Sequence, residues 1–89
     1  MAVKQFDVAL SLAGRDTGSL YVVSQLIDEN HCLVIDGKTK PILKPKKKKF
    51  KHICKTNFFA DGLAQKIAQG AYMQDAEVRK TLKFFKNNL

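Results

Sequence analysis

The stretch VALSLAGRDTGSLYVVSQLI, from Val8 to Ile27, decides the fold of this chain. Apolar residues alternate with small ones from Val8 to Ala13, and this alternation predicts a β-strand. Gly14 and Gly18 then bracket a short turn. The β-branched and aromatic residues of Leu20–Ile27 predict a second strand. Together these features predict a β-hairpin.

The turn between the two glycines does not have the features of a nucleotide-binding loop. It lacks the lysine and the following helix that a P-loop requires. The segment GKT at 37–39 fails too, because Pro41 follows it and disfavours a helix. In the first turn, Asp16 and Thr17 can hydrogen-bond the local backbone, which leaves Arg15 free to point outward.

Three more strands are predicted at Cys32–Ile35, Thr39–Leu43 and Phe50–Lys55. Asp36-Gly37 is a strong hairpin signal, and Pro41 restricts the Thr39–Leu43 strand to a sheet edge. In the last strand, Ile53 is expected to point inward.

Two amphipathic helices are predicted after Asn57. The first covers residues 62–69, with Asp61 as its cap and Gly70 as its end. The second covers residues 76–88, with Asp75 as its cap. The first presents Leu63 and Ile67 on one face; the second presents Val78, Leu82 and Phe85, and carries Lys83 and Lys86 near its C-terminal end.

Five strands followed by two short helices indicate a single, mainly β domain. At 89 residues the chain is long enough for one small core. We expect a small five-stranded barrel over residues 1–57. A helical extension over residues 58–89 would then pack on or beside it.

The positive charge of the chain is concentrated in one segment. The net charge is +8, yet nine lysines and no acidic residue fall within the eighteen residues from Lys38 to Lys55. The other 71 residues carry seven basic and eight acidic side chains and are nearly neutral. Such a block predicts a polyanionic partner, because displacing counterions from a phosphate backbone supplies affinity. A membrane surface would need an adjacent amphipathic helix, which Pro41 and Pro45 disfavour.

Enzymatic and metal chemistry have little support in the sequence. The pairs His31-Cys32 and His52-x-Cys54 lack the spacing of a zinc knuckle. The carboxylates fall at turns and helix starts, where capping explains them. The first residues make a poor signal peptide, which favours reduced cysteines in the cytoplasm. We expect no catalytic residue, metal, cofactor, small-molecule substrate or membrane partner.

The segment LAGRDTGSLYVVSQLIDENHCLVIDG, residues 12–37, resembles a KOW motif. More narrowly, AGRDTG, VIDGKTK and the following lysine run, taken together, are similar to the archaeal and eukaryotic large-subunit ribosomal protein family fourteen-e and to short bacterial KOW-type RNA-binding proteins. The resemblance covers about residues 6–57 and leaves out the two helices. It implies an SH3-like barrel that binds ribosomal RNA through its loops. The KOW modules of the NusG class are a second candidate relative.

This resemblance and the charge pattern together predict a non-enzymatic RNA-binding protein that acts on ribosomal RNA or the ribosome during translation. Ribosomal proteins are further candidate partners. Gly14, Asp16 and Gly18 are expected to build the turn. The predicted RNA contacts are Arg15, Thr17, Lys38, Lys40, Lys44, Lys46, Lys47, Lys48, Lys49, Lys51 and His52. The alternative is a KOW-type interaction module whose barrel or C-terminal helices dock on transcription or translation machinery. The apolar stripe Val78–Leu82–Phe85 motivates this alternative.

Overall fold

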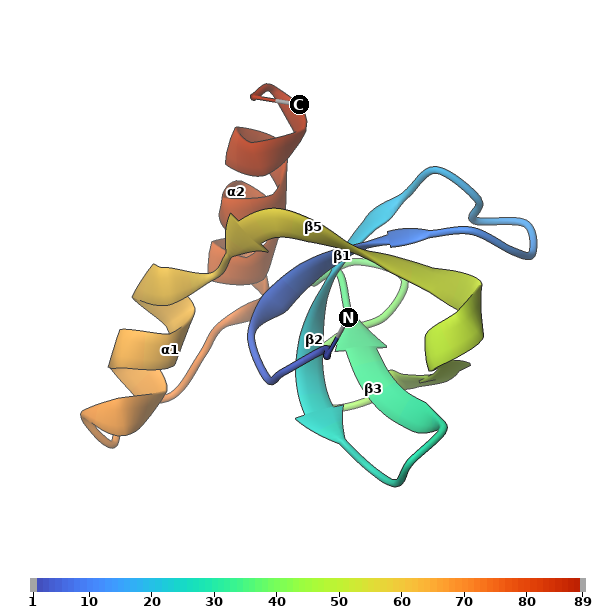
Figure 1. The fold of residues 1–89 in the computed structure, drawn as a ribbon. Coiled ribbons are helices and arrows are strands. Elements are labelled where there is room, and N and C mark those ends of the chain that lie inside the picture. The colour runs from blue at the N-terminus through green and yellow to red at the C-terminus, as the bar shows by residue number, and fades with distance from the viewer. Residues whose placement is uncertain (1, 89) are drawn as a thin grey trace.

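A computed structural model of the protein describes residues 2–88 and contains five strands and two helices (Figure 1). One antiparallel sheet has the strand order β4-β3-β2-β1-β5, so β4 and β5 are its edge strands. The elements are β1 (Asp7–Ser11), β2 (Leu20–Leu26), β3 (His31–Ile35), β4 (Lys46–Lys49), a 3₁₀ turn η1 (Phe50–His52), β5 (Ile53–Phe59), α1 (Asp61–Ala68) and α2 (Asp75–Lys86).

The predicted hairpin of the first two strands is confirmed. Leu10 pairs with Leu20 across it, and the amide N–H of Gly18 donates to the carbonyl of Ser11 over 2.9 Å. Gly14 and Gly18 have φ values of +90° and +92°, which L side chains rarely adopt. The first strand ends at Ser11, before the predicted Ala13, because the chain has already begun to turn.

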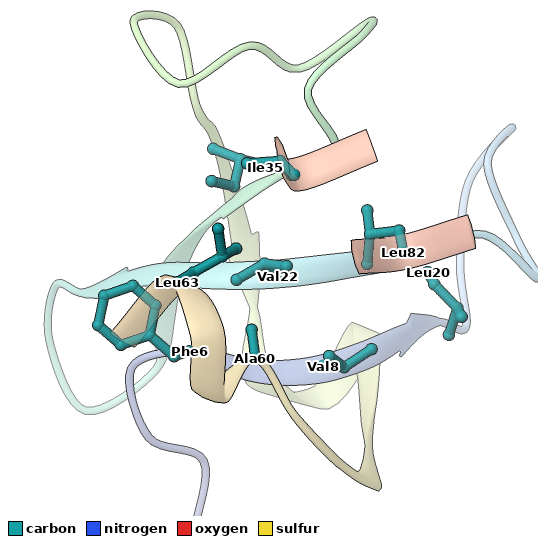
Figure 2. Packing of buried hydrophobic residues seen from close by; sticks show 9 residues of the cluster. Phe6, Val8, Leu20, Val22, Ile35, Ala60, Leu63 and Leu82 are labelled. Carbon is teal, nitrogen blue, oxygen red and sulfur yellow. The ribbon is translucent and has the colours of Figure 1, made fainter. Parts of the chain in front are cut away.

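The central strands are buried on both faces over part of their length, which explains why the first four residues of β2, Leu20–Val23, are all apolar. Alternate residues of each strand point to opposite faces. One face packs under the helices and forms the helix-side core, made of Phe6, Val8, Leu20, Val22, Ile35, Ala60, Leu63, Val78 and Leu82 (Figure 2). The other face forms the far-side core, made of Ala9, Tyr21, Val23, Cys32, Val34 and Ile53.

The predicted fourth strand at Thr39–Leu43 is wrong. Asp36 accepts hydrogen bonds from the backbone N–H groups of Lys38 and Lys40, over 2.8 and 2.7 Å, and curls this segment into a turn. The strand that pairs with β3 lies further along the chain, at Lys46–Lys49. An edge strand tolerates this run of lysines because one side of it faces solvent.

The fifth strand is shifted from its predicted position. Residues Phe50–His52 form the 3₁₀ turn, and β5 begins at Ile53, whose side chain is buried as expected. The N–H of Phe50 donates to the carbonyl of Asn30, and the N–H of Leu12 donates to the carbonyl of His52, both over 2.9 Å. These bonds hold the turn where the chain passes from one sheet edge to the other.

Both predicted helices are present, but their caps differ from the expectation. Asp61 and Asp75 are the first residues of α1 and α2, and the N-cap positions are Ala60 and Gln74. In α2, Gln74 and Glu77 form a capping box. The Asp75 carboxylate instead accepts the N–H of Ile42 over 2.9 Å and so ties α2 to the loop before β4.

The helices share one core with the sheet. Leu63, Val78 and Leu82 are buried in the helix-side core, and the Phe85 ring stacks on Phe58 with ring centroids 4.7 Å apart. Ile67 stays 40% exposed, so only part of the predicted α1 face is buried. No helix within residues 2–88 is long and apolar enough to cross a membrane.

Candidate nucleic-acid interface

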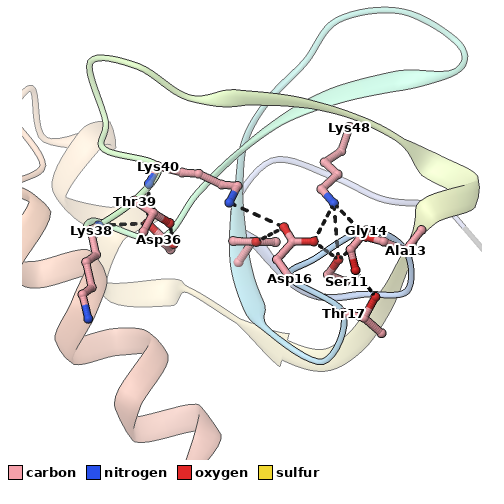
Figure 3. Close-up of polar contacts among 11 residues, drawn as sticks. Ser11, Ala13, Gly14, Asp16, Thr17, Asp36, Lys38, Thr39, Lys40 and Lys48 are labelled. Atoms are coloured by element: carbon pink, nitrogen blue, oxygen red, sulfur yellow. Dashed lines mark hydrogen bonds and ion pairs between the residues drawn. The ribbon is translucent and has the colours of Figure 1, made fainter.

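The carboxylate of Asp16, in the glycine-bounded turn, is the centre of a polar cluster beneath that turn. One carboxylate oxygen accepts hydrogen bonds from Ser11 Oγ over 2.9 Å and from Lys48 Nζ over 3.1 Å. The other accepts the hydroxyl of Tyr21 and lies 3.5 Å from Lys40 Nζ. Figure 3 shows the two lysines converging on this carboxylate from β4 and from the Asp36–Lys40 turn.

These contacts set the ionisation of the cluster. Burial opposes the charge on Asp16, but the hydrogen bonds from Tyr21, Lys48 and Ser11 outweigh it and hold the pKa of the carboxyl well below its usual range. Burial and the hydrogen bond to this carboxylate raise the pKa of Tyr21. Asp16 is therefore an anion at neutral pH, and it compensates the lysines that face it.

Lys48 is consequently an internal residue rather than a surface contact. Its side chain is 8% exposed, and its Nζ also donates to Ser11 Oγ and to the carbonyl of Ala13, each over 3.3 Å. In the β3–β4 ladder it pairs with Cys32, a member of the far-side core. A buried ammonium needs such partners, because desolvation of an unpaired charge is costly.

Lys40 is held in a similar way. Its side chain is 14% exposed, and its Nζ lies 3.5 Å from Asp16 and 4.9 Å from the centre of the Tyr21 ring. Lys40 and Lys48 were predicted to contact RNA, but both ammonium groups point toward the Asp16 carboxylate. Through these contacts Lys48 ties the glycine-bounded turn to β4, and Lys40 ties it to the Asp36–Lys40 turn.

Lys47 and Lys49 point the other way. In the ladder they pair with Leu33 and His31, on the face of β3 opposite to Cys32 and Val34. The exposed members of the predicted set are Arg15, Thr17, Lys38, Lys44, Lys46, Lys47, Lys49 and Lys51, and His52 is half-buried. The hydroxyl of Thr17 donates to the carbonyl of Gly14 over 2.7 Å and so helps to close the turn.

A groove joins the glycine-bounded turn to the lysine strand. This β4 groove is lined by Ala13, Gly14, His31, Lys46, Lys47, Lys48, Lys49 and His52. The start of the turn and four of the eight predicted lysines, Lys46 to Lys49, therefore line one surface, which the sequence alone could not show. His31 was missed as a member; only the strand register, which sets it opposite Lys49, identifies it.

A second groove lies on the other side of the same turn. This α2 groove is lined by Gly18, Ser19, Leu20, Asp36, Lys38, Arg79, Leu82, Lys83 and Lys86. Of these, sequence reasoning selected Lys38 as a contact and gave Gly18 a role in the turn. The spacing of Arg79, Lys83 and Lys86 puts them on one side of α2, which was the available signal.

The comparisons with known proteins do not identify a family. A scan against models of known protein families finds no match, and a search of curated protein sequences finds none either. Within the described part of the chain, no three side chains of the metal-binding types come together. Cys32 is buried, and burial raises the pKa of its thiol to about 11, whereas Cys54 is exposed.

Proposed function

We propose that this chain binds RNA without catalysing a reaction, through the β4 groove and the glycine-bounded turn. The observation that supports this most is the sidedness of β4. Lys47 and Lys49 face outward, and Lys46 is exposed at the start of the strand although it pairs with Val34 on the face of Lys48. None of the three has an ion-pair partner among residues 2–88. The lining of the β4 groove contains four lysines and two histidines and no carboxylate. Behind it, Lys48 is paired with Asp16, and His31 Nδ1 lies 2.9 Å from Asp28 Oδ1, so the groove cations left unpaired within the described residues are Lys46, Lys47 and Lys49. A phosphate backbone supplies the missing counter-charge and releases its condensed counterions.

We further propose that the curved sheet is an SH3-like barrel of the KOW type and that the RNA is ribosomal. The sequence resemblance motivates both proposals. The bonds of the 3₁₀ turn to Asn30 and Leu12 support the barrel, because they draw the β4 edge toward the β5 edge. A role on the ribosome in translation follows from the same resemblance.

Each group has a distinct task in this account. Lys47 and Lys49 bind phosphates along the outside of β4, and Arg15 reaches a phosphate or a base edge from the tip of the turn. Asp16 and its buried partners hold the turn in the fold and make no contact with the RNA. Recognition depends mainly on RNA shape, since lysines carry charge but read no base.

The test is a salt titration of binding to a structured RNA, such as a ribosomal RNA hairpin, with duplex DNA as competitor. We expect the wild-type affinity to fall steeply with salt and the RNA to outcompete the duplex. The variant Lys47→Gln/Lys49→Gln should weaken binding and reduce the salt slope by about 1 to 2, the loss expected for two phosphate contacts.

The matched control is Lys4→Gln/Lys80→Gln, which removes the same charge from two exposed lysines outside both grooves. We expect the control to stay close to the wild-type protein. A wild-type affinity that barely responds to salt, or equal losses in the two double variants, would overturn the proposal. Duplex DNA that competes as well as the RNA would contradict the preference for RNA.

A further inference from the structure

The α2 groove is a second basic surface that the proposed RNA contact leaves unexplained. Four of its lining residues are cationic, namely Lys38, Arg79, Lys83 and Lys86, and one, Asp36, is acidic. Its floor includes the apolar side chains of Leu20 and Leu82. In Figure 3 Lys38 extends along α2, away from Asp16.

The two walls of this groove are fixed relative to each other. Gly37 is buried where the Asp36–Lys40 turn meets α2, and a Cβ there would lie 2.4 Å from the carbonyl oxygen of Asp75. Arg79 Nη1 donates to the carbonyl of Gly37 over 2.6 Å. The N–H of Ile42 donates to Asp75 over 2.9 Å. These contacts keep the lysines of α2 in a constant position opposite Lys38.

The cations of the groove have no ion-pair partner among residues 2–88. Lys38, Lys83 and Lys86 are exposed, and no ion pair to any of them occurs in the part of the chain that the structure describes. Asp36 directs its carboxylate into its own turn, accepting the N–H groups of Lys38 and Lys40 and the hydroxyl of Thr39. The favourable place of two lysines near a helix C-terminus accounts for Lys83 and Lys86 but not for Lys38.

The glycine-bounded turn stands between the two grooves. Ala13 and Gly14, at its start, line the β4 groove, and Gly18 and Ser19, at its end, line the α2 groove. Arg15 is exposed between them. A polyanion that crosses this turn therefore meets positive charge on both sides.

We propose that the α2 groove binds phosphate groups of the same RNA backbone, with Lys38, Lys83 and Lys86 as the donors. Arg79 acts as a positioning residue, because its bond to Gly37 holds the helix against the turn. This inference rests on the proposed RNA binding and extends it to the C-terminal helix. The two grooves lie on either side of one turn, so a nucleic-acid backbone can fill both with its regularly spaced phosphates. An acidic protein would need separate carboxylate clusters shaped to each groove, so we favour a nucleic acid.

The experiment compares Lys83→Gln/Lys86→Gln with the control Lys4→Gln/Lys80→Gln, using the same RNA hairpin and salt series. Lys80 is on the same helix but outside the groove. We expect the groove variant to bind RNA about three- to tenfold more weakly. The slope of log affinity against log salt concentration should become shallower by about 1 to 2. Lys38→Gln, on the opposite wall, should lose about 1 of the slope. Thermal unfolding checks that each variant is folded.

The failures of the two proposals are distinguishable. If Lys83→Gln/Lys86→Gln matches its control while Lys47→Gln/Lys49→Gln weakens RNA binding, the α2 groove is not part of the interface and this inference is overturned alone. If the wild-type protein binds no RNA, both proposals fail. A separate titration with inorganic phosphate and a mononucleotide, followed by NMR at Lys38 and Lys83, identifies the source of the phosphate. Saturation by either as tightly as by RNA would overturn the backbone assignment.

Discussion

The ammonium group of Lys48 lies 3.1 Å from a carboxylate oxygen of Asp16, across 32 residues of sequence. This pair joins the edge strand β4 to the turn between β1 and β2. It turns one lysine of a four-lysine strand inward, while Lys47 and Lys49 on either side of it point outward. The lysine run therefore divides into an internal ion pair and an external charged face.

Replacing Lys48 tests the internal half of this division. Lys48→Gln leaves Asp16 without its closest cation in a mostly buried site, so we expect the free energy of unfolding to fall by about 2 to 4 kcal/mol. Urea unfolding measures the change. The matched variant Lys47→Gln, one residue away and exposed, should change stability by less than about 0.5 kcal/mol. Equal effects of the two substitutions would show that Lys48 is not held as the structure indicates.

The low pKa of Asp16 predicts how stability depends on pH. A carboxyl whose pKa falls on folding stabilises the protein above its unfolded pKa, here 3.8, and this contribution is lost as the pH falls from there toward the folded pKa. We expect the free energy of unfolding to decrease below about pH 4 and the decrease to be shallower in Asp16→Asn. The acid destabilisation that remains in Asp16→Asn comes in part from Asp36, where burial opposes the charge but hydrogen bonds within its turn outweigh it and lower the pKa.

Urea unfolding of both proteins at a series of pH values checks this prediction. Asp16→Asn is also expected to be less stable than the wild-type protein at neutral pH, because the ion pairs with Lys48 and Lys40 are lost. If the free energy of unfolding of Asp16→Asn falls as steeply below about pH 4 as that of the wild-type protein, Asp16 is not the source of the acid sensitivity.

Gly37 provides a test of the contact between α2 and the Asp36–Lys40 turn. Its φ is +75°, and an added Cβ would meet the carbonyl oxygen of Asp75 at 2.4 Å. We expect Gly37→Ala to lower the free energy of unfolding by about 2 to 4 kcal/mol, through backbone strain and displacement of α2. Gly62→Ala is the control, because Gly62 lies in α1 with nothing within 4 Å of the added Cβ. It should raise stability by about 0.5 to 1 kcal/mol through helix propensity, and equal losses at both glycines would refute the docking contact.

The parts of the fold that sequence predicted well depend on local signals. The β1–β2 hairpin follows from strand alternation and from two glycines at positions that require positive φ. Helix α2 follows from the four-residue spacing of Val78 and Leu82, and α1 from the spacing of Leu63 and Ile67, of which Leu63 is buried. In each case the residues that determine the structure are close together in the chain.

Most of the parts that sequence missed depend on partners distant in the chain. The β-propensity of Thr39–Leu43 is overridden by the side chain of Asp36, which is close in sequence, and by the bond from Ile42 to Asp75, 33 residues away. The inward turn of Lys48 depends on Asp16, and a row of identical lysines carries no local signal of which one is buried. The α2 groove exists only once Gly37 has let the helix dock, so composition alone could not reveal it.

The central claim is that outward lysines bind RNA while inward lysines hold the fold, and two charge-balanced double variants test it most directly. Lys48→Gln/Asp16→Asn removes the internal pair. Lys47→Gln/Asp61→Asn removes one exposed lysine of the β4 groove together with the exposed carboxylate of Asp61, which lies outside both grooves. Net charge is the same in both. RNA affinity is measured across a salt series at a temperature where both variants are folded. We predict that the first variant stays within about twofold of the wild-type affinity, and that the second loses about 1 of the salt slope. The reverse pattern, with RNA binding lost on removing the internal pair and kept without Lys47, would contradict the account.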